Sequence, residues 1–340
     1  MTIDGAGSAE ENGVESSSAT LPATSLRSAR RQSAYLAWGA LTVAGLLYGY
    51  NWVVMKTALK YADPASFAAL RVFLGAVFLF AVVVLLRRPL LPTNWLLTAL
   101  VGLFGMTGST GLTIWALESG GAGKTSVVVY TMPVWLLLMS WLILGERLHG
   151  IQWLLVLATL TGLLFVIAPW KTHGTLLSSF LAIGAGVCSA AASITVKVLS
   201  RDRRVDLLTL TAWQMLLGSL PLILIAFLTA DSGPRWTGWF SAALLYNAVF
   251  ASAVAALLWF YTLRHLPAGT AGLGRLLAPV VGVGASWIQL GERPDRYEAV
   301  GMVLILLGLA ALAGQQIMRE RRAASLREPA AIVADQPPGD

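Results

Sequence analysis

The feature that most constrains this chain is a series of ten apolar stretches, separated by short breaks at charged residues, Pro or Gly. A helix needs about 20 apolar residues to cross the roughly 30 Å hydrocarbon core of a bilayer. The stretches lie at about 34–59, 64–86, 94–118, 121–144, 151–170, 176–199, 206–230, 236–263, 268–290 and 296–318. The pattern therefore predicts an all-α polytopic membrane protein with ten transmembrane helices.

Composition excludes a soluble fold for this chain. Hydrophobic residues make up 56% of the sequence and charged residues only 12%, whereas charged residues are about 25% of an average soluble domain. The breaks between the stretches are too short for a folded extramembrane domain, so any function must lie among the helices. Residues 1–33 and 319–340 contain few large apolar residues, and we expect them to be disordered tails.

The distribution of positive charge predicts the orientation of the chain. The formal net charge is +7, but Lys and Arg lie between the spans and in the tails and form no basic face, so we expect no nucleic-acid partner. Fourteen Lys and Arg residues fall on the side of the termini and five on the other side. Because positive loops stay inside, we expect an integral protein of the bacterial inner membrane with both termini cytoplasmic.

An internal repeat divides the chain into two halves. The segment PVWLLLMSWLILGER, from Pro133 to Arg147, has an ungapped second copy, PVVGVGASWIQLGER, from Pro279 to Arg293. Gly45 and Lys56 likewise match Gly186 and Lys197 at one common spacing. The sequence thus predicts two repeats of five helices, at residues 34–170 and 171–318.

An odd number of helices in each repeat has a geometric consequence. The second copy enters the membrane from the opposite face, so the halves form inverted repeats related by an axis in the membrane plane. In such an arrangement a state open to one side becomes a state open to the other when the halves exchange conformations. The organisation predicts a secondary transporter that works by alternating access, with a small-molecule substrate and the lipid bilayer as its partners.

The motifs resemble one transporter family. The paired Pro-x11-Gly-Glu-Arg helices, the Gly49-x-Asn51-Trp52-x3-Lys56 segment and Arg71 are similar to those of the drug/metabolite transporter superfamily, in its ten-helix EamA-type branch. The resemblance covers residues from about 34 to 318. It implies an exporter or facilitator of small metabolites, often amino acids, with a cavity between the two halves.

The repeated helices also contain candidate hinges and gates. Pro133 and Pro279 lie within spans, where each removes a backbone hydrogen bond, so we expect kinks that either line the cavity or are static bends. The Gly-Glu-Arg motifs end their helices at opposite faces of the membrane. The charged residues of these motifs form either a solvated rim or a pair of gates. They are Glu146, Arg147, Glu292 and Arg293.

Charges within the spans favour an anionic substrate. No carboxylate falls near the middle of a predicted helix, whereas Arg275 lies about seven residues into the ninth span. A charge at that depth is costly and usually functional. We expect Arg275 either to bind a substrate carboxylate or to reach the nearer interface. The hypothesis places polar and aromatic side chains around the substrate, namely Asn51, Trp52, Tyr130 and Trp259.

The alternative functions are a membrane-embedded enzyme and a non-transporting membrane scaffold. An enzyme would need a nucleophile with a base, paired carboxylates or metal ligands, but the three His residues lie in loops. Cys188 is the only cysteine, so neither a disulfide nor a cysteine metal cluster is expected. The sequence predicts no cofactor. A scaffold would need an extramembrane domain to bind a partner, and we expect none in this chain.

Overall fold

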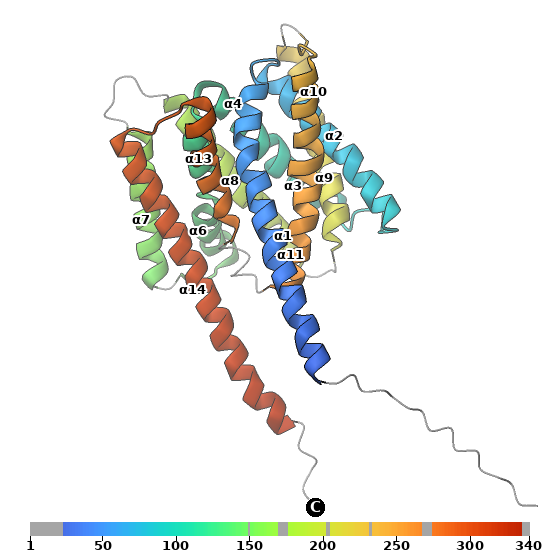
Figure 1. The fold of residues 1–340 in the computed structure, drawn as a ribbon, viewed down its shortest axis with the longest axis vertical. Coiled ribbons are helices and arrows are strands. Elements are labelled where there is room, and N and C mark those ends of the chain that lie inside the picture. Colours follow the sequence, from blue (N-terminus) through green and yellow to red (C-terminus); the bar gives the residue numbers. More distant parts are fainter. Residues whose placement is uncertain are drawn as a thin grey trace, which may run out of the picture.

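The computed structural model describes residues 23–148, 150–168, 176–201, 205–230, 233–266 and 274–334, and every regular element in these ranges is a helix (Figure 1). The first half contains α1 (Ala23–Ala58), α2 (Pro64–Leu85), α3 (Trp95–Gly102), the π-helical segment η1 (Leu103–Gly111), α4 (Leu112–Ser119), α5 (Ala122–Val129), α6 (Met132–Leu144) and α7 (Gly150–Ile167). The second half contains α8 (Leu176–Leu199), α9 (Leu207–Thr229), α10 (Gly238–Leu245), the π-helical segment η2 (Tyr246–Val254), α11 (Ala255–His265), α13 (Leu277–Leu290) and α14 (Arg296–Ala334).

Several of these helices are long and apolar enough to cross a bilayer. Within the described residues there are 7 such stretches: Pro64–Leu85, Trp95–Ser119, Ala122–Leu144, Gly150–Ile167, Leu176–Leu199, Leu207–Thr229 and Arg296–Met318. The helix Leu277–Leu290 is apolar but shorter. The all-α polytopic class predicted from the sequence is confirmed, and the count of ten spans stays a prediction.

Both ends of the helical chain lie at one end of the bundle. The first residues of α1 and the last residues of α14 both lie there, and we call this end the terminal face (Figure 1). The carboxyl ends of α4 and α13 lie at the other end, which we call the opposite face (Figure 1). Two chain ends lie on the same side when the chain crosses the membrane an even number of times, so this arrangement is consistent with an even number of crossings.

The outer helices extend further than the sequence predicts. Residues before 34 and after 318 were expected to be disordered, yet α1 begins at Ala23 and α14 continues to Ala334. These extensions are rich in Ala and Arg, which are strong helix formers. A helix already anchored in the bundle can therefore continue beyond it. Residues 1–22 and 335–340 lie outside the described residues.

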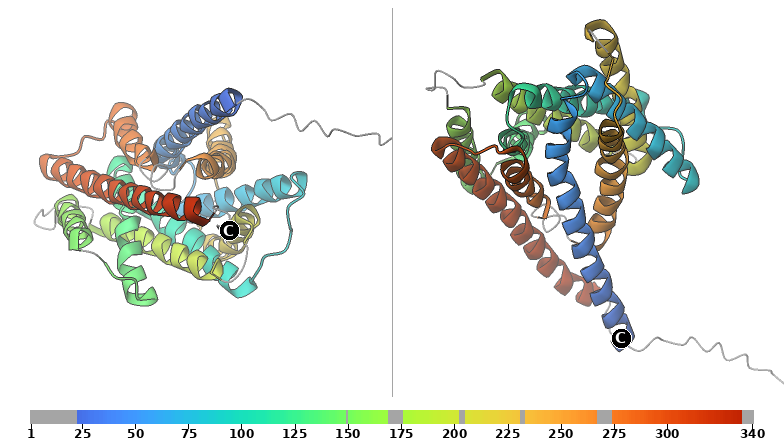
Figure 2. Two further views of the ribbon diagram at one scale, coloured as in Figure 1. Left: turned by 90° about the horizontal axis from the view of Figure 1, so that it is seen from below. Right: turned by 45° about the horizontal axis from the view of Figure 1, so that its top comes forward.

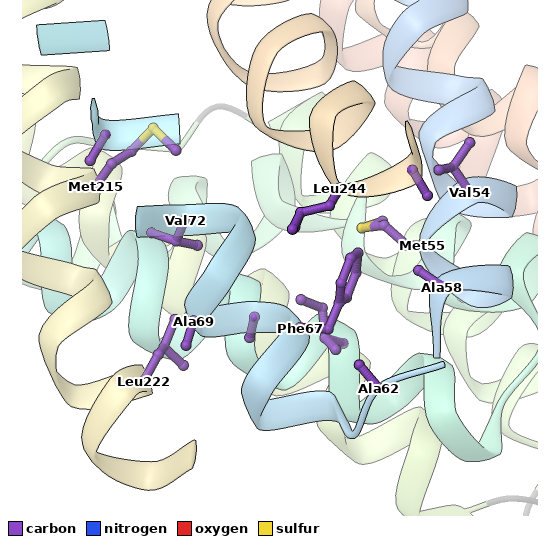
Figure 3. Packing of buried hydrophobic residues seen from close by; sticks show 14 of the residues in the cluster. Val54, Met55, Ala58, Ala62, Phe67, Ala69, Val72, Met215, Leu222 and Leu244 are labelled. Atoms are coloured by element: carbon purple, nitrogen blue, oxygen red, sulfur yellow. The ribbon is translucent and has the colours of Figure 1, made fainter. Parts of the chain in front are cut away.

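Side-chain packing joins the two sequence halves. α2 packs along α9, and α7 packs along α14 (Figure 2). One buried cluster combines Met55 of α1, Phe67 and Val72 of α2 and Leu222 of α9 (Figure 3). A second cluster is built mainly from α5 to α8 and α14. The hydrophobic interior is therefore shared between the halves.

Glycines allow the closest of these contacts. A Cβ on Gly218 of α9 would lie 2.4 Å from the carbonyl oxygen of Gly102 in α3, and one on Gly162 of α7 would lie 2.8 Å from that of Gly301 in α14. Gly108 in η1 packs instead against Cys188 of α8. The glycine-rich third span thus brings backbone close to two helices of the second half, as small residues do between membrane helices.

Local structures recur at the same sequence spacing in both halves. Asp63 and Asp206 accept N-cap hydrogen bonds at the starts of α2 and α9. Asn94 and Thr237 do the same for α3 and α10. The segments η1 and η2 follow at matching positions in the third and eighth predicted spans. These pairs support the proposed duplication, which places residues 34–170 and 171–318 in separate repeats.

The predicted kink at Pro133 is a break between two helices. The fourth span is interrupted at Tyr130 and Thr131, and Pro133 lies in the first turn of α6. Pro279 lies in the first turn of α13. Proline suits a first turn because the amide hydrogen that it lacks has no helical partner there. Each proline therefore lies where a described helix starts.

Candidate functional site

Two of the predicted binding residues are in ring contact between α1 and the break that follows α5. Trp52 is 5% exposed, and its ring centroid lies 6.3 Å from that of Tyr130 at an interplanar angle of 56°. Tyr130 is the C-cap of α5, so its position depends on the interruption before α6. The break thus places an aromatic ring against the first helix.

Arg275 joins this aromatic group. It precedes α13, its side chain is exposed, and its guanidinium lies 6.0 Å from the ring centroid of Tyr48 on α1. Its charge also acts electrostatically on the hydroxyl of Tyr130. A cation over an aromatic face is attracted by the ring quadrupole. The structure therefore brings together Arg275, Tyr48, Tyr130 and Trp52, which we call the Arg275 cluster.

The sequence reasoning missed Tyr48. It lies four residues before Trp52, so the two side chains share one face of α1. That spacing was the available signal. Gly45 and Gly49 permit this face to approach α13, because a Cβ on Gly49 would lie 2.7 Å from the carbonyl oxygen of Ala278.

The other two predicted binding residues are Asn51 on α1 and Trp259 on α11. Asn51 is adjacent to Trp52 and 6% exposed, and its Oδ1 has no hydrogen-bond partner among the described residues. A buried acceptor without a partner is costly. Trp259 lies on α11, and its side chain lies outside the described part of the structure. The two prolines differ, since Pro133 is exposed and Pro279 is buried.

A second basic side chain lies between α1 and α2. Nη1 of Arg71 lies 2.6 Å from Sδ of Met55, and its Nε is buried without a hydrogen-bond partner among the described residues. Thioether sulfur is a weak acceptor for a guanidinium. Its burial beside Met55 is consistent with a structural role for Arg71.

The two Gly-Glu-Arg motifs share one backbone geometry. Gly145 and Gly291 both end their helices in the left-handed conformation, with φ of 67° and 69°. Their amides donate to the carbonyls of Ser140 and Ser286 respectively. This conformation favours glycine, because a side chain would be strained there. It directs the Glu that follows each glycine away from its own helix.

The two glutamates have different partners. Oε2 of Glu292 accepts hydrogen bonds from the backbone amides of Ala122, at 2.6 Å, and Gly123, at 3.4 Å. Glu146 instead forms an ion pair with Lys197 of α8. Arg147 and Arg293, the arginines that follow these glutamates, are both exposed. The symmetric sequence motif is therefore asymmetric in its contacts.

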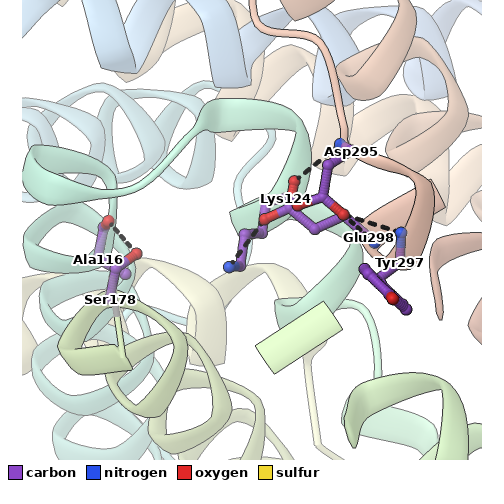
Figure 4. A network of polar contacts seen from close by, with 6 residues as sticks. All are labelled: Ala116, Lys124, Ser178, Asp295, Tyr297 and Glu298. Carbon is purple, nitrogen blue, oxygen red and sulfur yellow. Dashed lines mark hydrogen bonds and ion pairs between the residues drawn. The ribbon is translucent and has the colours of Figure 1, made fainter. Parts of the chain in front are cut away.

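A charged pocket surrounds Glu292 at the opposite face. It has a volume of about 280 Å³ and includes Glu292, Arg293, Lys124 and Glu298 in its lining. Nζ of Lys124 on α5 lies 3.1 Å from Oε1 of Glu298 on α14, an ion pair between the two halves (Figure 4). No group of three or more His, Cys, Asp or Glu residues that could hold a metal ion occurs within the described ranges.

Known proteins resemble the chain over most of its length. The model of the EamA-like transporter family matches twice, at residues 36–168 and 176–314. An uncharacterized transporter, YoaV, from Bacillus subtilis (strain 168) is 27% identical over 274 residues, which cover 78% of this chain and 92% of that protein. A probable amino-acid metabolite efflux pump from Escherichia coli (strain K12) is 27% identical over 277 residues, covering 78% and 90%.

A solved structure has the same fold. One crystal structure superposes with a TM-score of 0.57 at 18% sequence identity, and the match covers 83% of this chain and 95% of that one. At this identity the match is evidence for the fold alone. The family match and the names of the relatives indicate a transporter and not an enzyme.

Proposed function

The chain belongs to the EamA-like transporter family, and we propose that it exports a small metabolite, such as an amino acid, by alternating access. Membership of this family makes it a small-molecule transporter in a membrane. The direction, the substrate and the mechanism are our proposal. One relative named as an amino-acid metabolite efflux pump supports the export of this substrate class.

The Arg275 cluster is the observation that supports this substrate most directly. A guanidinium over the ring of Tyr48, whose charge also acts on Tyr130, combines a positive charge with aromatic surface. A carboxylate would pair with the guanidinium, and an apolar or aromatic side chain would contact the rings. We propose that Arg275, Tyr130, Trp52, Asn51 and Trp259 bind the substrate, and that the helices starting near Pro133 and Pro279 line the cavity.

The proposed mechanism uses the two repeats as moving bodies. Residues 34–170 and 171–318 would exchange conformations, so that the cavity opens to one face at a time. Glu146 and Arg147 would act as a gate at the terminal face, and Glu292 and Arg293 at the opposite face. We further propose that the protein lies in the bacterial inner membrane with its terminal face toward the cytoplasm.

Transport by the purified protein in proteoliposomes tests this proposal. Radiolabelled amino acids and related metabolites would be loaded individually, and their exit would be followed with and without a pH gradient. We expect saturable exit of at least one carboxylate-containing metabolite, and no such exit from liposomes without protein. Exit of only cationic or neutral compounds would contradict the proposed substrate class.

A further inference from the structure

An apolar groove lies between α2 and α9 on an exposed side of the bundle. It has a volume of about 300 Å³, and its lining includes Phe73 of α2, Ile223 and Ala226 of α9, and Trp236 of the segment before α10. Phe73, Ile223 and Trp236 are exposed, at 38%, 40% and 63% of their surfaces. Both helices are long and apolar enough to cross a bilayer, so this surface faces lipid tails. We call this pocket the lateral groove.

A polar pocket adjoins the lateral groove at the opposite face. It has a volume of about 230 Å³, and its lining includes Asp63, Glu118 and Arg235, so we call it the Arg235 pocket. Alternate residues of the segment 233–236 line the groove and the pocket. This segment is therefore a wall with one apolar side and one charged side.

Contacts with the chain that follows α1 position Arg235. Its backbone amide donates to the carbonyl of Tyr61 at 2.7 Å, and its Nη2 donates to the carbonyl of Lys60. The guanidinium lies 5.8 Å from the ring centroid of Tyr61, and the side chain is exposed. Because a guanidinium has five N–H donors, donors remain for an anionic group of a ligand.

Two carboxylates supply the opposite charge in the same pocket. Oδ1 of Asp63 accepts from the amide of Ser66 at the N-cap of α2, whereas its Oδ2 has no hydrogen-bond partner among the described residues. Glu118, at the end of α4, is exposed. The pocket therefore offers acceptors for the N–H donors of a ligand as well as a guanidinium for its anion.

Aromatic side chains indicate the depth of the Arg235 pocket in the membrane. The rings of Tyr61 and Trp239 stack with their centroids 5.5 Å apart, and Trp236 is in edge contact with Phe240. Trp and Tyr are enriched at the level of the lipid headgroups. The charged pocket thus lies at headgroup level, and the lateral groove lies beside it along the spans.

We infer that the lateral groove and the Arg235 pocket together bind one phospholipid whose headgroup has a primary ammonium, such as phosphatidylethanolamine. An acyl chain fills the groove, because an empty groove would lose its dispersion contacts on one side. The phosphate pairs with Arg235, and the ammonium donates to Glu118 and Asp63. This lipid site depends neither on the substrate nor on the direction of transport.

The choice of headgroup follows from the two signs of charge in the pocket. Phosphatidylglycerol has a phosphate but no ammonium for the two carboxylates. Phosphatidylcholine has a quaternary ammonium, which has no N–H to donate. Because α2 belongs to the first half of the chain and α9 to the second, the bound lipid would contact both halves.

The unmodified protein tests the headgroup. The full chain, purified in detergent and stripped of lipid, would be titrated with palmitoyl-oleoyl phosphatidylethanolamine and with the phosphatidylglycerol and phosphatidylcholine that have the same acyl chains. Native mass spectrometry counts the lipids bound to each protein. We expect one site that binds phosphatidylethanolamine about tenfold more tightly than the other two, because each of those lacks the charge-assisted hydrogen bonds of the ammonium.

Substitutions in the pocket and in the groove test where the lipid binds. Arg235→Gln should weaken phosphatidylethanolamine binding about tenfold through loss of the contact with the phosphate. Arg296→Gln is the matched control and should bind normally, since Arg296 is also exposed and lies 4.9 Å from a tyrosine ring centroid, that of Tyr297. Ala226→Phe should weaken binding by filling the groove. Glu118→Gln should reduce the preference for phosphatidylethanolamine over phosphatidylcholine.

Several results would overturn the inference. Equal binding of the three lipids by the unmodified protein, or tighter binding of phosphatidylglycerol, would reject the headgroup, and this comparison does not depend on how any variant folds. Normal binding by both Arg235→Gln and Ala226→Phe would place the lipid elsewhere. Dimers of the unmodified protein that Ala226→Phe converts to monomers would identify a second copy of the chain as the occupant of the groove.

Discussion

At the scale of single residues, the choice of partner decides what each charged group does. Arg275 lies over the ring of Tyr48, Arg71 lies against Met55, and Lys56 binds backbone carbonyls. In the sequence all three are basic residues in or near the predicted spans. Their surroundings differ because each is positioned by a different pair of helices.

Arg275 provides the sharpest residue-scale prediction for transport. Arg275→Ala should abolish exit of a carboxylate substrate in proteoliposomes, because the positive charge beside Tyr48 is lost. Arg275→Lys should weaken transport, since lysine keeps the charge but lacks the planar fork that binds both carboxylate oxygens. Arg201→Gln, which removes an exposed arginine after α8, is the matched control and should transport normally. Normal transport by correctly inserted Arg275→Gln would contradict this role.

At the scale of helices, glycine contacts set how closely elements approach. Gly102 of α3 meets Gly218 of α9, whereas Gly284 of α13 has no atom within 4 Å of the position that a Cβ would take. The glycine spacing in the sequence indicated a close-packing face. Only the fold shows which helix each glycine contacts.

Gly218→Ala should destabilise the protein at this contact. The added Cβ would lie 2.4 Å from the carbonyl oxygen of Gly102 and 2.5 Å from Cβ of Met106. Overpacking of this kind costs about 1–3 kcal/mol. Thermal unfolding in detergent should therefore show a lower midpoint for Gly218→Ala than for Gly284→Ala. Equal unfolding midpoints for the two variants would show that α3 and α9 can move apart without a loss of stability.

At the scale of the whole molecule, topology determines which loops share a face. Gly150 begins α7 and Arg296 begins α14, and these helices pack along each other. The Lys and Arg distribution predicts that the two positions face opposite sides of the membrane.

Labelling of single cysteines tests this topology in intact cells. In the Cys188→Ser background, Arg296→Cys should react with a membrane-impermeant maleimide added outside, and Gly150→Cys should react only after the cells are permeabilised. Tyr297, beside Arg296, is partly buried, so Tyr297→Cys is a control for reactivity that local burial limits. Reaction of both main positions from the same side would reject the inverted-repeat arrangement.

The sequence by itself determined the protein class and the transporter family. Apolar stretches of membrane length form helices, because in hydrocarbon the backbone N–H and C=O groups of each stretch must hydrogen-bond with one another. The two Gly-Glu-Arg motifs and the Pro residues were likewise visible as a repeat. The substrate site of Arg275, Asn51, Trp52, Tyr130 and Trp259 stays a prediction. In the structure Trp52 is in ring contact with Tyr130, and Arg275 lies over the ring of Tyr48.

The tertiary structure alone decided where the repeat becomes asymmetric. Glu146 and Glu292 occupy identical motifs with the same glycine conformation before them, yet one pairs with Lys197 and the other caps α5. A sequence repeat specifies which groups are available, but not which partner lies within bonding distance. That distance depends on how the two halves pack in a given state. It is set by long-range contacts that no local pattern encodes.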